Sequence, residues 1–150
     1  MAIAEAIYAD PSALLKLYLN EPQSRAMTTW RAKIKGSLMV THHGRVELLN
    51  GIGLAAHRGM VTDAVGDAAL AALDDDFEQG RYTVTDMLWR ATMKRAGDLS
   101  RQYTRRIGCR SLDILHVASA LELKCRSFLT FDVRQQQLAR SVKLKLIIPA

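Results

Sequence analysis

Four carboxylates occupy positions where a negative charge needs a partner. Asp10 directly follows an apolar run in "AIYADPSALL", and Asp132 follows "SFLTF" in the same way. Glu47 lies in "GRVELLNGIGLAA" and Asp113 in "CRSLDILHVASALEL", two segments with many apolar residues. A carboxylate in such surroundings is unusual unless it is paired or bound to a metal. If the fold brings the four together, a cation must neutralise them, and hard oxygen ligands select Mg²⁺ or Mn²⁺.

Each acid taken alone also has a simpler structural role. Asp10 fits a helix cap or a turn, Asp132 fits the cap of a short helix, and Glu47 can pair with a nearby base. Asp113 is close enough to a helix start to be a first-turn acid favoured by the helix dipole. His116 shares the helix face of Asp113, and we interpret it as a packed, hydrogen-bonded histidine that orients this helix. The combination favours a metal centre, and such metals activate water for cleavage of phosphate esters.

The elements that must position these residues are predicted from short apolar runs and helical patterns. Strands are expected at Ile3–Ala9, Ser37–Thr41, Tyr82–Thr85, Ser127–Phe131 and Leu144–Ile148. Helices are expected at Pro11–Asn20, Pro22–Ile34, Arg45–Arg58, Val61–Gln79, Asp86–Arg106, Ser111–Lys124 and Val133–Arg140. The alternation predicts an α/β fold with a mainly parallel sheet covered on both faces. Sites in such sheets gather at the carboxyl ends of strands, where Asp10 and Asp132 are expected.

Length and composition indicate one globular domain. The chain has 150 residues, of which 49% are hydrophobic, and no repeat or linker divides it, so we expect a single domain over residues 1–150. No window is apolar enough for a membrane span, and the N-terminus lacks the basic region of a signal peptide. Cys109 and Cys125 have no paired spacing, which is typical of reduced thiols in a cytoplasmic protein.

The positive charge is concentrated in the second half of the chain. Residues 1–80 hold seven Lys and Arg against ten Asp and Glu, a net charge of −3. Residues 81–150 hold fourteen against five, a net charge of +9. This asymmetry favours a polyanionic partner, with nucleic acid preferred over a membrane, although a solvated basic surface would give the same composition.

Four segments taken together resemble a known family. "YADPSALLKLYLNEP", "RVELLNGI", "SLDILHVASALEL" and "FLTFD" occur in the order found in PIN-domain ribonucleases, and more narrowly resemble the VapC toxins of toxin–antitoxin pairs. The resemblance runs from about Ile7 to the C-terminal strand. It implies a three-layer α/β/α sandwich, an acidic site that binds Mg²⁺ or Mn²⁺, and endoribonuclease activity on structured RNA.

The resemblance also implies roles for particular residues and partners. By motif position, Asp10, Glu47, Asp113 and Asp132 form the catalytic, metal-binding quartet, and the hydroxyl residues Ser12 and Thr130 support it. The family usually forms homodimers and is silenced by a cognate antitoxin that enters the active-site groove. Two alternatives stay open at this point. The chain can be a catalytically silent PIN-like RNA-binding or regulatory module, or a structure-specific DNA nuclease.

A basic stripe on one predicted helix suggests where RNA binds. Within 86–106, four basic residues fall within an arc of about 60° at 100° per residue; they are Arg90, Lys94, Arg101 and Arg105. Leu88, Ala96, Leu99 and Tyr103 lie roughly opposite and are expected to pack on the sheet. The stripe then either follows a phosphate backbone or is an ordinary solvated helix face.

Other conspicuous residues are assigned structural roles. We expect His42 and His43 in a surface loop, because adjacent histidines without a third ligand are weak evidence for a metal. The acidic run at 74–78 is expected to be solvated. The tryptophans Trp30 and Trp89 are expected in the core or an interface, and the glycines of "GIG" at 51–53 are expected to permit close helix packing.

Overall fold

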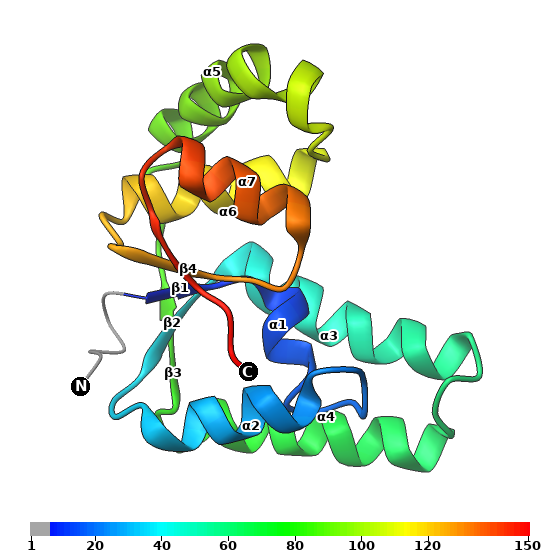
Figure 1. Ribbon diagram of the computed structural model, residues 1–150. Helices are drawn as coiled ribbons and strands as arrows, with labels where there is room; N and C mark the ends of the chain where they lie inside the picture. The colour runs from blue at the N-terminus through cyan, green and yellow to red at the C-terminus, as the bar shows by residue number, and fades with distance from the viewer. Residues whose placement is uncertain (1–6) are drawn as a thin grey trace.

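A parallel sheet forms the centre of the molecule. The computed structural model describes residues 7–150, and within them five strands are ordered β3-β2-β1-β4-β5 (Figure 1). Neighbouring strands all pair in parallel. The strands are β1 (Ile7–Ala9), β2 (Leu38–Thr41), β3 (Tyr82–Thr85), β4 (Ser127–Leu129) and β5 (Lys145–Ile147). The predicted parallel sheet is confirmed, and residues 3–6 of the first predicted strand lie outside the described residues.

Helices cover the sheet on both faces. They are α1 (Pro11–Leu15), α2 (Ser24–Lys33), α3 (His42–His57), α4 (Asp63–Glu78), α5 (Trp89–Ile107), α6 (Ser111–Glu122) and α7 (Val133–Ser141). Figure 1 shows α1 to α4 on one side of the sheet and α5 to α7 on the other. The predicted three-layer α/β/α sandwich is therefore confirmed. Among the helices described here, none has the length and apolar character needed to cross a membrane.

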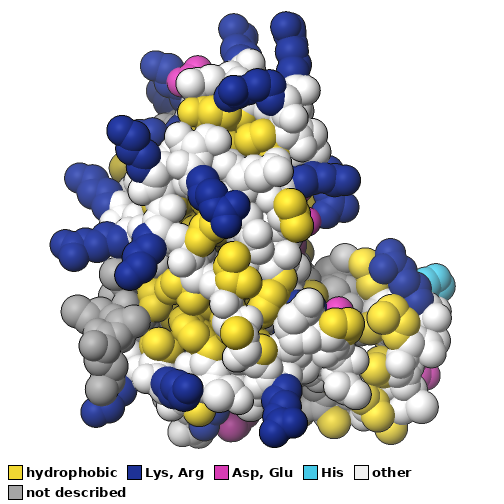
Figure 2. Space-filling view, in the orientation of Figure 1, with side chains coloured by type: hydrophobic (Ala, Val, Ile, Leu, Met, Phe, Trp, Pro, Cys, Tyr) yellow, Lys and Arg dark blue, Asp and Glu magenta, His cyan; other side chains and the backbone are white. Residues whose placement is uncertain are grey.

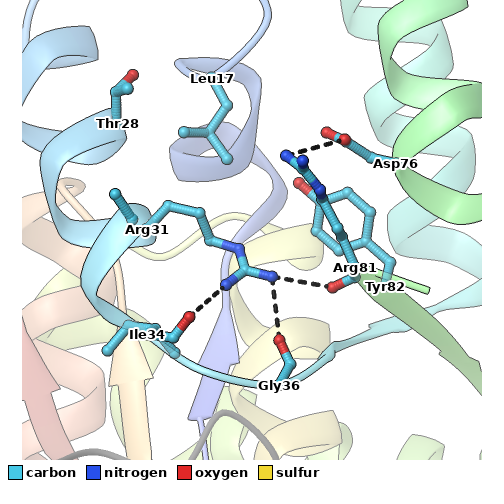
Figure 3. A pocket seen from close by; sticks show the side chains of 9 residues that line it. Leu17, Thr28, Arg31, Ile34, Gly36, Asp76, Arg81 and Tyr82 are labelled. Atoms are coloured by element: carbon cyan, nitrogen blue, oxygen red, sulfur yellow. Dashed lines mark hydrogen bonds and ion pairs between the residues drawn. The ribbon is translucent and has the colours of Figure 1, made fainter. Parts of the chain in front are cut away.

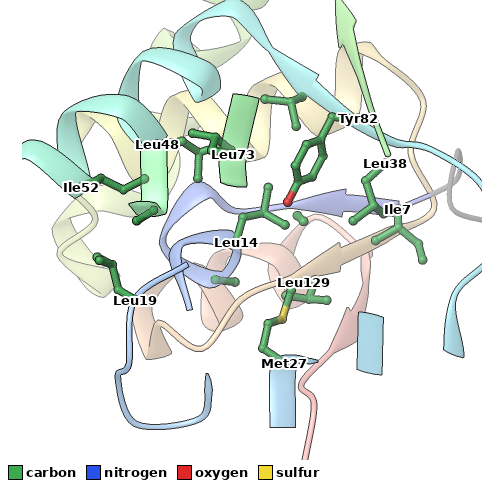
Figure 4. Packing of buried hydrophobic residues seen from close by; sticks show 14 of the residues in the cluster. Ile7, Leu14, Leu19, Met27, Leu38, Leu48, Ile52, Leu73, Tyr82 and Leu129 are labelled. Atoms are coloured by element: carbon green, nitrogen blue, oxygen red, sulfur yellow. The ribbon is translucent and has the colours of Figure 1, made fainter. Parts of the chain in front are cut away.

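The pleat of the central strands divides the core into two clusters. Successive side chains of a strand point to opposite faces of the sheet. Ile7 and Ala9 of β1 pack in one buried cluster with α1 to α4, whereas Tyr8 packs in the other with α6 and α7. The same division separates Leu129 from Phe128 in β4. Figure 4 shows the first cluster, in which apolar side chains of the helices and of the sheet converge. Burial on both faces explains why the central strands β1 and β4 lack polar alternation.

The helix bounds differ from those expected by one to five residues, and for two helices hydrogen bonds give the reason. α1 ends at Leu15, although the pattern predicts helix to Asn20, because most of the following amides bond to carbonyls three residues back in a tighter turn. α3 begins at His42 rather than at Arg45. The reason is that the Thr41 hydroxyl accepts a hydrogen bond from an amide of the first turn and so caps the helix earlier.

One of the two glycines in "GIG" permits close packing between helices. A Cβ atom at Gly51 would lie 2.6 Å from Cδ1 of Leu15, so the absence of a side chain lets α3 approach α1. A Cβ atom at Gly53 would meet nothing within 4 Å. The predicted packing role therefore applies to Gly51 and not to Gly53.

The order of the strands creates a crevice beside β1. The chain proceeds from β1 to β2 and β3 on one side, and returns to β4 and β5 on the other. The crevice at the carboxyl ends of β1 and β4 is thus a topological switch point, where open α/β sheets bind ligands. The amide of Asp10 donates to the carbonyl of Leu129 over 2.9 Å, which carries the pairing of β1 and β4 to this edge.

Candidate active site

The four predicted acids lie around one cavity at this switch point. The cavity has a volume of about 470 Å³. Asp10 precedes α1 and Asp132 precedes α7, while Glu47 lies in α3 and Asp113 in the first turn of α6. The other residues that line the cavity are Ser12, Arg110, Ser111, Leu112, His116 and Gln135. The fold thus brings together carboxylates from four separate parts of the chain.

Asp10 is both a helix cap and a wall of the cavity. Its Oδ2 accepts hydrogen bonds from the amide of Ser12, over 3.1 Å, and from the Ser12 hydroxyl. Its Oδ1 accepts a hydrogen bond of 2.9 Å from Nε2 of Gln135. Burial raises the pKa of Asp10, and the neighbouring His116 and these hydrogen bonds oppose the shift. The two structural alternatives for Asp10, a cap and a member of a site, are therefore compatible.

Gln135 joins Asp10 to Thr130 and was not identified from the sequence. The Thr130 hydroxyl donates to Oε1 of Gln135 over 2.6 Å and accepts a hydrogen bond of 3.1 Å from the amide of Asp132. This contact directs the Nε2 group of Gln135 toward Asp10. Thr130 is fully buried and lies behind the cavity rather than in its wall. The one sequence signal for Gln135 is its place three residues after Asp132, the helix cap.

Glu47 forms a hydrogen bond with His116, which also contacts a residue of the sheet. Nε2 of His116 lies 2.8 Å from Oε1 of Glu47, and Nδ1 lies 2.7 Å from the hydroxyl of Tyr8. A carboxylate only accepts, so Nε2 carries the proton that it donates to Glu47. Burial lowers the pKa of His116, but the hydrogen bond to Glu47 and the nearby carboxylates outweigh this and raise it. His116 thus connects α6 with both α3 and β1.

Asp113 and Asp132 also make local contacts at helix starts. Oδ2 of Asp113 accepts a hydrogen bond of 3.1 Å from the amide of Arg110, the residue before α6. The guanidinium of Arg110 lies 3.5 Å from the same oxygen, and its side chain is 73% exposed at the rim of the cavity. Oδ1 of Asp132 accepts a hydrogen bond of 3.0 Å from the amide of Gln135 in the first turn of α7. Both acids therefore combine a capping role with a place in the cavity wall.

The donor set fits a hard divalent cation in its chemistry. The four acids offer carboxylate oxygens, the ligands that Mg²⁺ and Mn²⁺ prefer. Burial raises the pKa of Asp10, so a bound cation would favour its charged form. Across residues 7–150, however, no group of three or more His, Cys, Asp and Glu side chains is arranged to hold a metal ion. Each carboxylate is instead directed to its own hydrogen-bond donors.

Metal binding at this cavity would have a measurable effect on stability. If the folded chain binds Mn²⁺ or Mg²⁺ and the unfolded chain does not, wild type gains about 2.7 kcal/mol at a hundredfold excess over Kd. We expect a rise in melting temperature that shrinks in the Asp10→Asn/Asp113→Asn double variant. Calorimetry with and without each metal measures both. Equal rises in the two proteins would mean that the ion binds elsewhere.

The prediction of a surface loop at His42 and His43 is wrong. Both residues begin α3, because the cap at Thr41 starts the helix early. His42 is exposed and lies 2.8 Å from Asp86. His43 is half-buried, and its ring lies against His116, with 5.1 Å between the centroids, and beside Trp89. Burial, followed by the influence of His116, lowers the pKa of His43 to about 4, so this ring is neutral at pH 7.

The predicted basic stripe is exposed, but its helix packs differently from expectation. Arg90, Lys94, Arg101 and Arg105 all lie on the exposed side of α5. α5 packs mainly against α6, which lies between it and the sheet (Figure 1), so the predicted packing of α5 on the sheet is wrong. Leu99 is buried there, whereas Leu88 precedes the helix and is 76% exposed.

A slightly larger cavity lies near the N-terminal ends of β2 and β3, and Asp76 is the one acid among its described lining residues. Its volume is about 500 Å³, and Arg31, Asp76 and Arg81 are among its lining residues (Figure 3). Arg31 donates to the carbonyls of Ile34, Gly36 and Arg81. Asp76 accepts from Tyr18 and pairs with Arg81 over 3.4 Å, so the predicted solvation of the acidic run does not hold for Asp76. These contacts join α2, α4 and the loop before β2.

The fold and the cavity place the chain among α/β/α proteins whose acids gather at the switch point of a parallel sheet. The family model described as PIN domain matches residues 7–141, and the chain belongs to the PIN domain family. PIN domains are generally metal-dependent nucleases, so membership indicates a nuclease that acts on nucleic acid. A comparison with curated proteins found no match.

Proposed function

We propose that this PIN domain protein is a metal-dependent endoribonuclease that serves as the toxin of a toxin–antitoxin pair. The observation that carries the proposal is the position of Asp10, Glu47, Asp113 and Asp132 around one cavity at the switch point. Membership of the PIN domain family supports nuclease activity. RNA as the substrate and the toxin role are supported by the four VapC-like segments and by the basic second half of the chain.

The residues of the cavity divide the work between binding and orientation. In this proposal the four carboxylates hold Mg²⁺ or Mn²⁺, which when bound lowers the pKa of water and stabilises negative charge on a phosphate. Ser12 and Gln135 orient Asp10, and His116 orients Glu47. Arg110 presents a positive charge at the rim, where a phosphodiester would enter. The oxygen of a water molecule would form a bond to the phosphorus and lose a proton to the solvent, while the P–O bond to the leaving oxygen breaks and that oxygen takes up a proton. No covalent nucleophile from the protein is then required.

One observation favours a second candidate, a PIN-like module that binds RNA without cutting it. Within the described part of the chain, the acids do not form a group that could hold a metal ion. Each carboxylate has its own protein donors, as a purely structural or recognition role would also require. The two functions differ in a single property, which is turnover of RNA in the presence of a divalent metal.

Cleavage by the purified protein distinguishes the two functions. A labelled RNA of mixed sequence and a DNA of the same sequence are incubated with Mn²⁺, with Mg²⁺ or with EDTA. We expect metal-dependent fragments from RNA and none with EDTA. Binding of RNA without fragments under any metal would favour the silent module, and cleavage of DNA alone would favour a DNA nuclease.

The proposed partners are a cognate antitoxin and a second copy of the chain. The supporting observation is exposed apolar surface at the start of α5, where Leu88, Trp89 and Met93 are 41% to 76% exposed. Leu88 and Trp89 also line a hollow of about 560 Å³. Exposed apolar groups gathered in this way are typical of interfaces. Light scattering tests the dimer. The antitoxin is tested by expressing the chain with and without any small protein encoded beside its gene, which should relieve the growth arrest that we expect.

A further inference from the structure

A second hollow opens beside the acid cavity, between α5 and α6. It has a volume of about 430 Å³, and its lining includes Arg101, Thr104, Arg105, Cys109 and Ser111. Ser111 lines both hollows, and Arg110 lines only the acid cavity. The two hollows therefore adjoin at Ser111, with the segment 109–111 between them. We call the second hollow the α5–α6 groove.

The α5–α6 groove is positively charged. Arg101 and Arg105 lie one helical turn apart on α5, and both are exposed. Over residues 7–150, neither takes part in an ion pair, whereas Arg95 pairs with Glu122 over 2.6 Å. No Asp or Glu of the described chain lines the groove. Lys and Arg side chains also gather over α5 to α7 in Figure 2, where few acidic groups are visible. The guanidinium groups in the groove are thus available to an anion.

We propose that the α5–α6 groove holds the phosphate backbone of the RNA strand whose scissile bond lies in the acid cavity, with Arg101 and Arg105 on its phosphates. The proposal rests on the proposed function and adds the path of the substrate. Guanidinium groups bind phosphate through paired N–H donors. Such contacts fix the position of a strand without reading its bases. The groove therefore sets how the strand enters the cavity and leaves sequence choice to other contacts.

The path uses only the C-terminal half of the basic stripe on α5. Lys94 lies about 10 Å along the helix axis from Arg101, at 1.5 Å per residue. Arg90 and Lys94 line the apolar hollow with Leu88 and Trp89 instead of the groove. Their replacement removes the same charge from the same helix, outside the proposed path. The two halves of the stripe thus provide a matched pair of variants.

Salt-dependent binding tests the path. The background is Asp132→Asn with EDTA, so that cleavage of a labelled single-stranded RNA of mixed sequence is suppressed while the cap of α7 is kept. For Arg101→Ala/Arg105→Ala, loss of two phosphate contacts lowers the slope of log affinity against log salt by about 1.4. If the two contacts contribute nothing at about 1 M salt, this change in slope lowers the RNA affinity roughly 25-fold at about 0.1 M salt. Arg90→Ala/Lys94→Ala should change both quantities much less. Circular dichroism of both variants shows that the helix is retained.

The possible outcomes separate this proposal from the proposed function. Equal losses in the two double variants, or no loss in Arg101→Ala/Arg105→Ala, would overturn the α5–α6 groove as the path. Cleavage of RNA by the wild-type protein in that case would leave the proposed function intact. If the wild-type protein cuts no RNA, but RNA affinity falls only in the Arg101→Ala/Arg105→Ala variant, the α5–α6 groove is supported as an RNA-binding site. The proposed nuclease activity is then contradicted.

Discussion

RNA cleavage falls roughly a hundredfold to a thousandfold when Asp132 is replaced by Asn, a loss typical of removing one group that stabilises the transition state. We expect the fold to be unchanged, because Asn can still accept the hydrogen bond from the amide of Gln135 and caps helices about as well as Asp. Asp10→Asn and Asp113→Asn should give similar losses.

Initial rates of fragment formation, measured with each variant at saturating Mn²⁺, test this prediction. Asp74→Asn is the matched control, because Asp74 is an exposed acid of α4 remote from the cavity. Its cleavage rate should equal that of wild type. A wild-type rate in purified Asp132→Asn or Asp10→Asn, at an unchanged melting temperature, would remove that acid from the proposed site.

Gln135→Leu should lower cleavage about 10- to 100-fold, the usual effect of losing a group that orients a metal ligand. The substitution removes the donor to Asp10 and the acceptor for the Thr130 hydroxyl. Two buried polar groups then lack their partner, so the free energy of unfolding should fall by about 1–3 kcal/mol. A role through Asp10 also predicts that more Mn²⁺ is needed for half-maximal cleavage.

The run of three glutamines supplies a close control. Gln137 lies two positions after Gln135 and is exposed. The substitution Gln137→Leu therefore adds the same apolar side chain to the same helix without touching the cavity. Metal titrations of cleavage and urea unfolding curves compare the two variants. A merely structural role for Gln135 would lower stability but leave the Mn²⁺ requirement at the wild-type value, and that result would contradict positioning of Asp10.

The central strands were predictable because they are buried on both faces of the sheet. Burial requires short apolar runs such as those of β1 and β2, and the polar residues around them mark their ends. The first and last residues of the helices were harder to predict from the sequence. α3 begins early because of one hydroxyl, that of Thr41, and α1 stops early because the chain tightens after Leu15. Both depend on individual hydrogen bonds that a periodic pattern does not contain.

The acids of the candidate site could be predicted from residue type, but the residues that orient them could not. A carboxylate after an apolar run is conspicuous in any sequence, as at Asp10 and Asp132. Gln135 stands in a row of identical residues, and only the start of α7 decides which of them faces Asp10. His43 looked like a loop residue because the contact of its ring with His116 joins segments far apart in the chain. Contacts of this kind depend on the three-dimensional arrangement.

The central place of β4 has a consequence for synthesis of the chain. β4 joins the sheet beside β1, yet the ribosome makes it after the six helices α1 to α6. Until residues 127–135 emerge, Asp10 lacks both its neighbouring strand and the amide group of Gln135, and Asp132 does not exist. If the proposed function is right, a fragment whose translation stops before residue 132 lacks one of the four acids and is expected not to cut RNA.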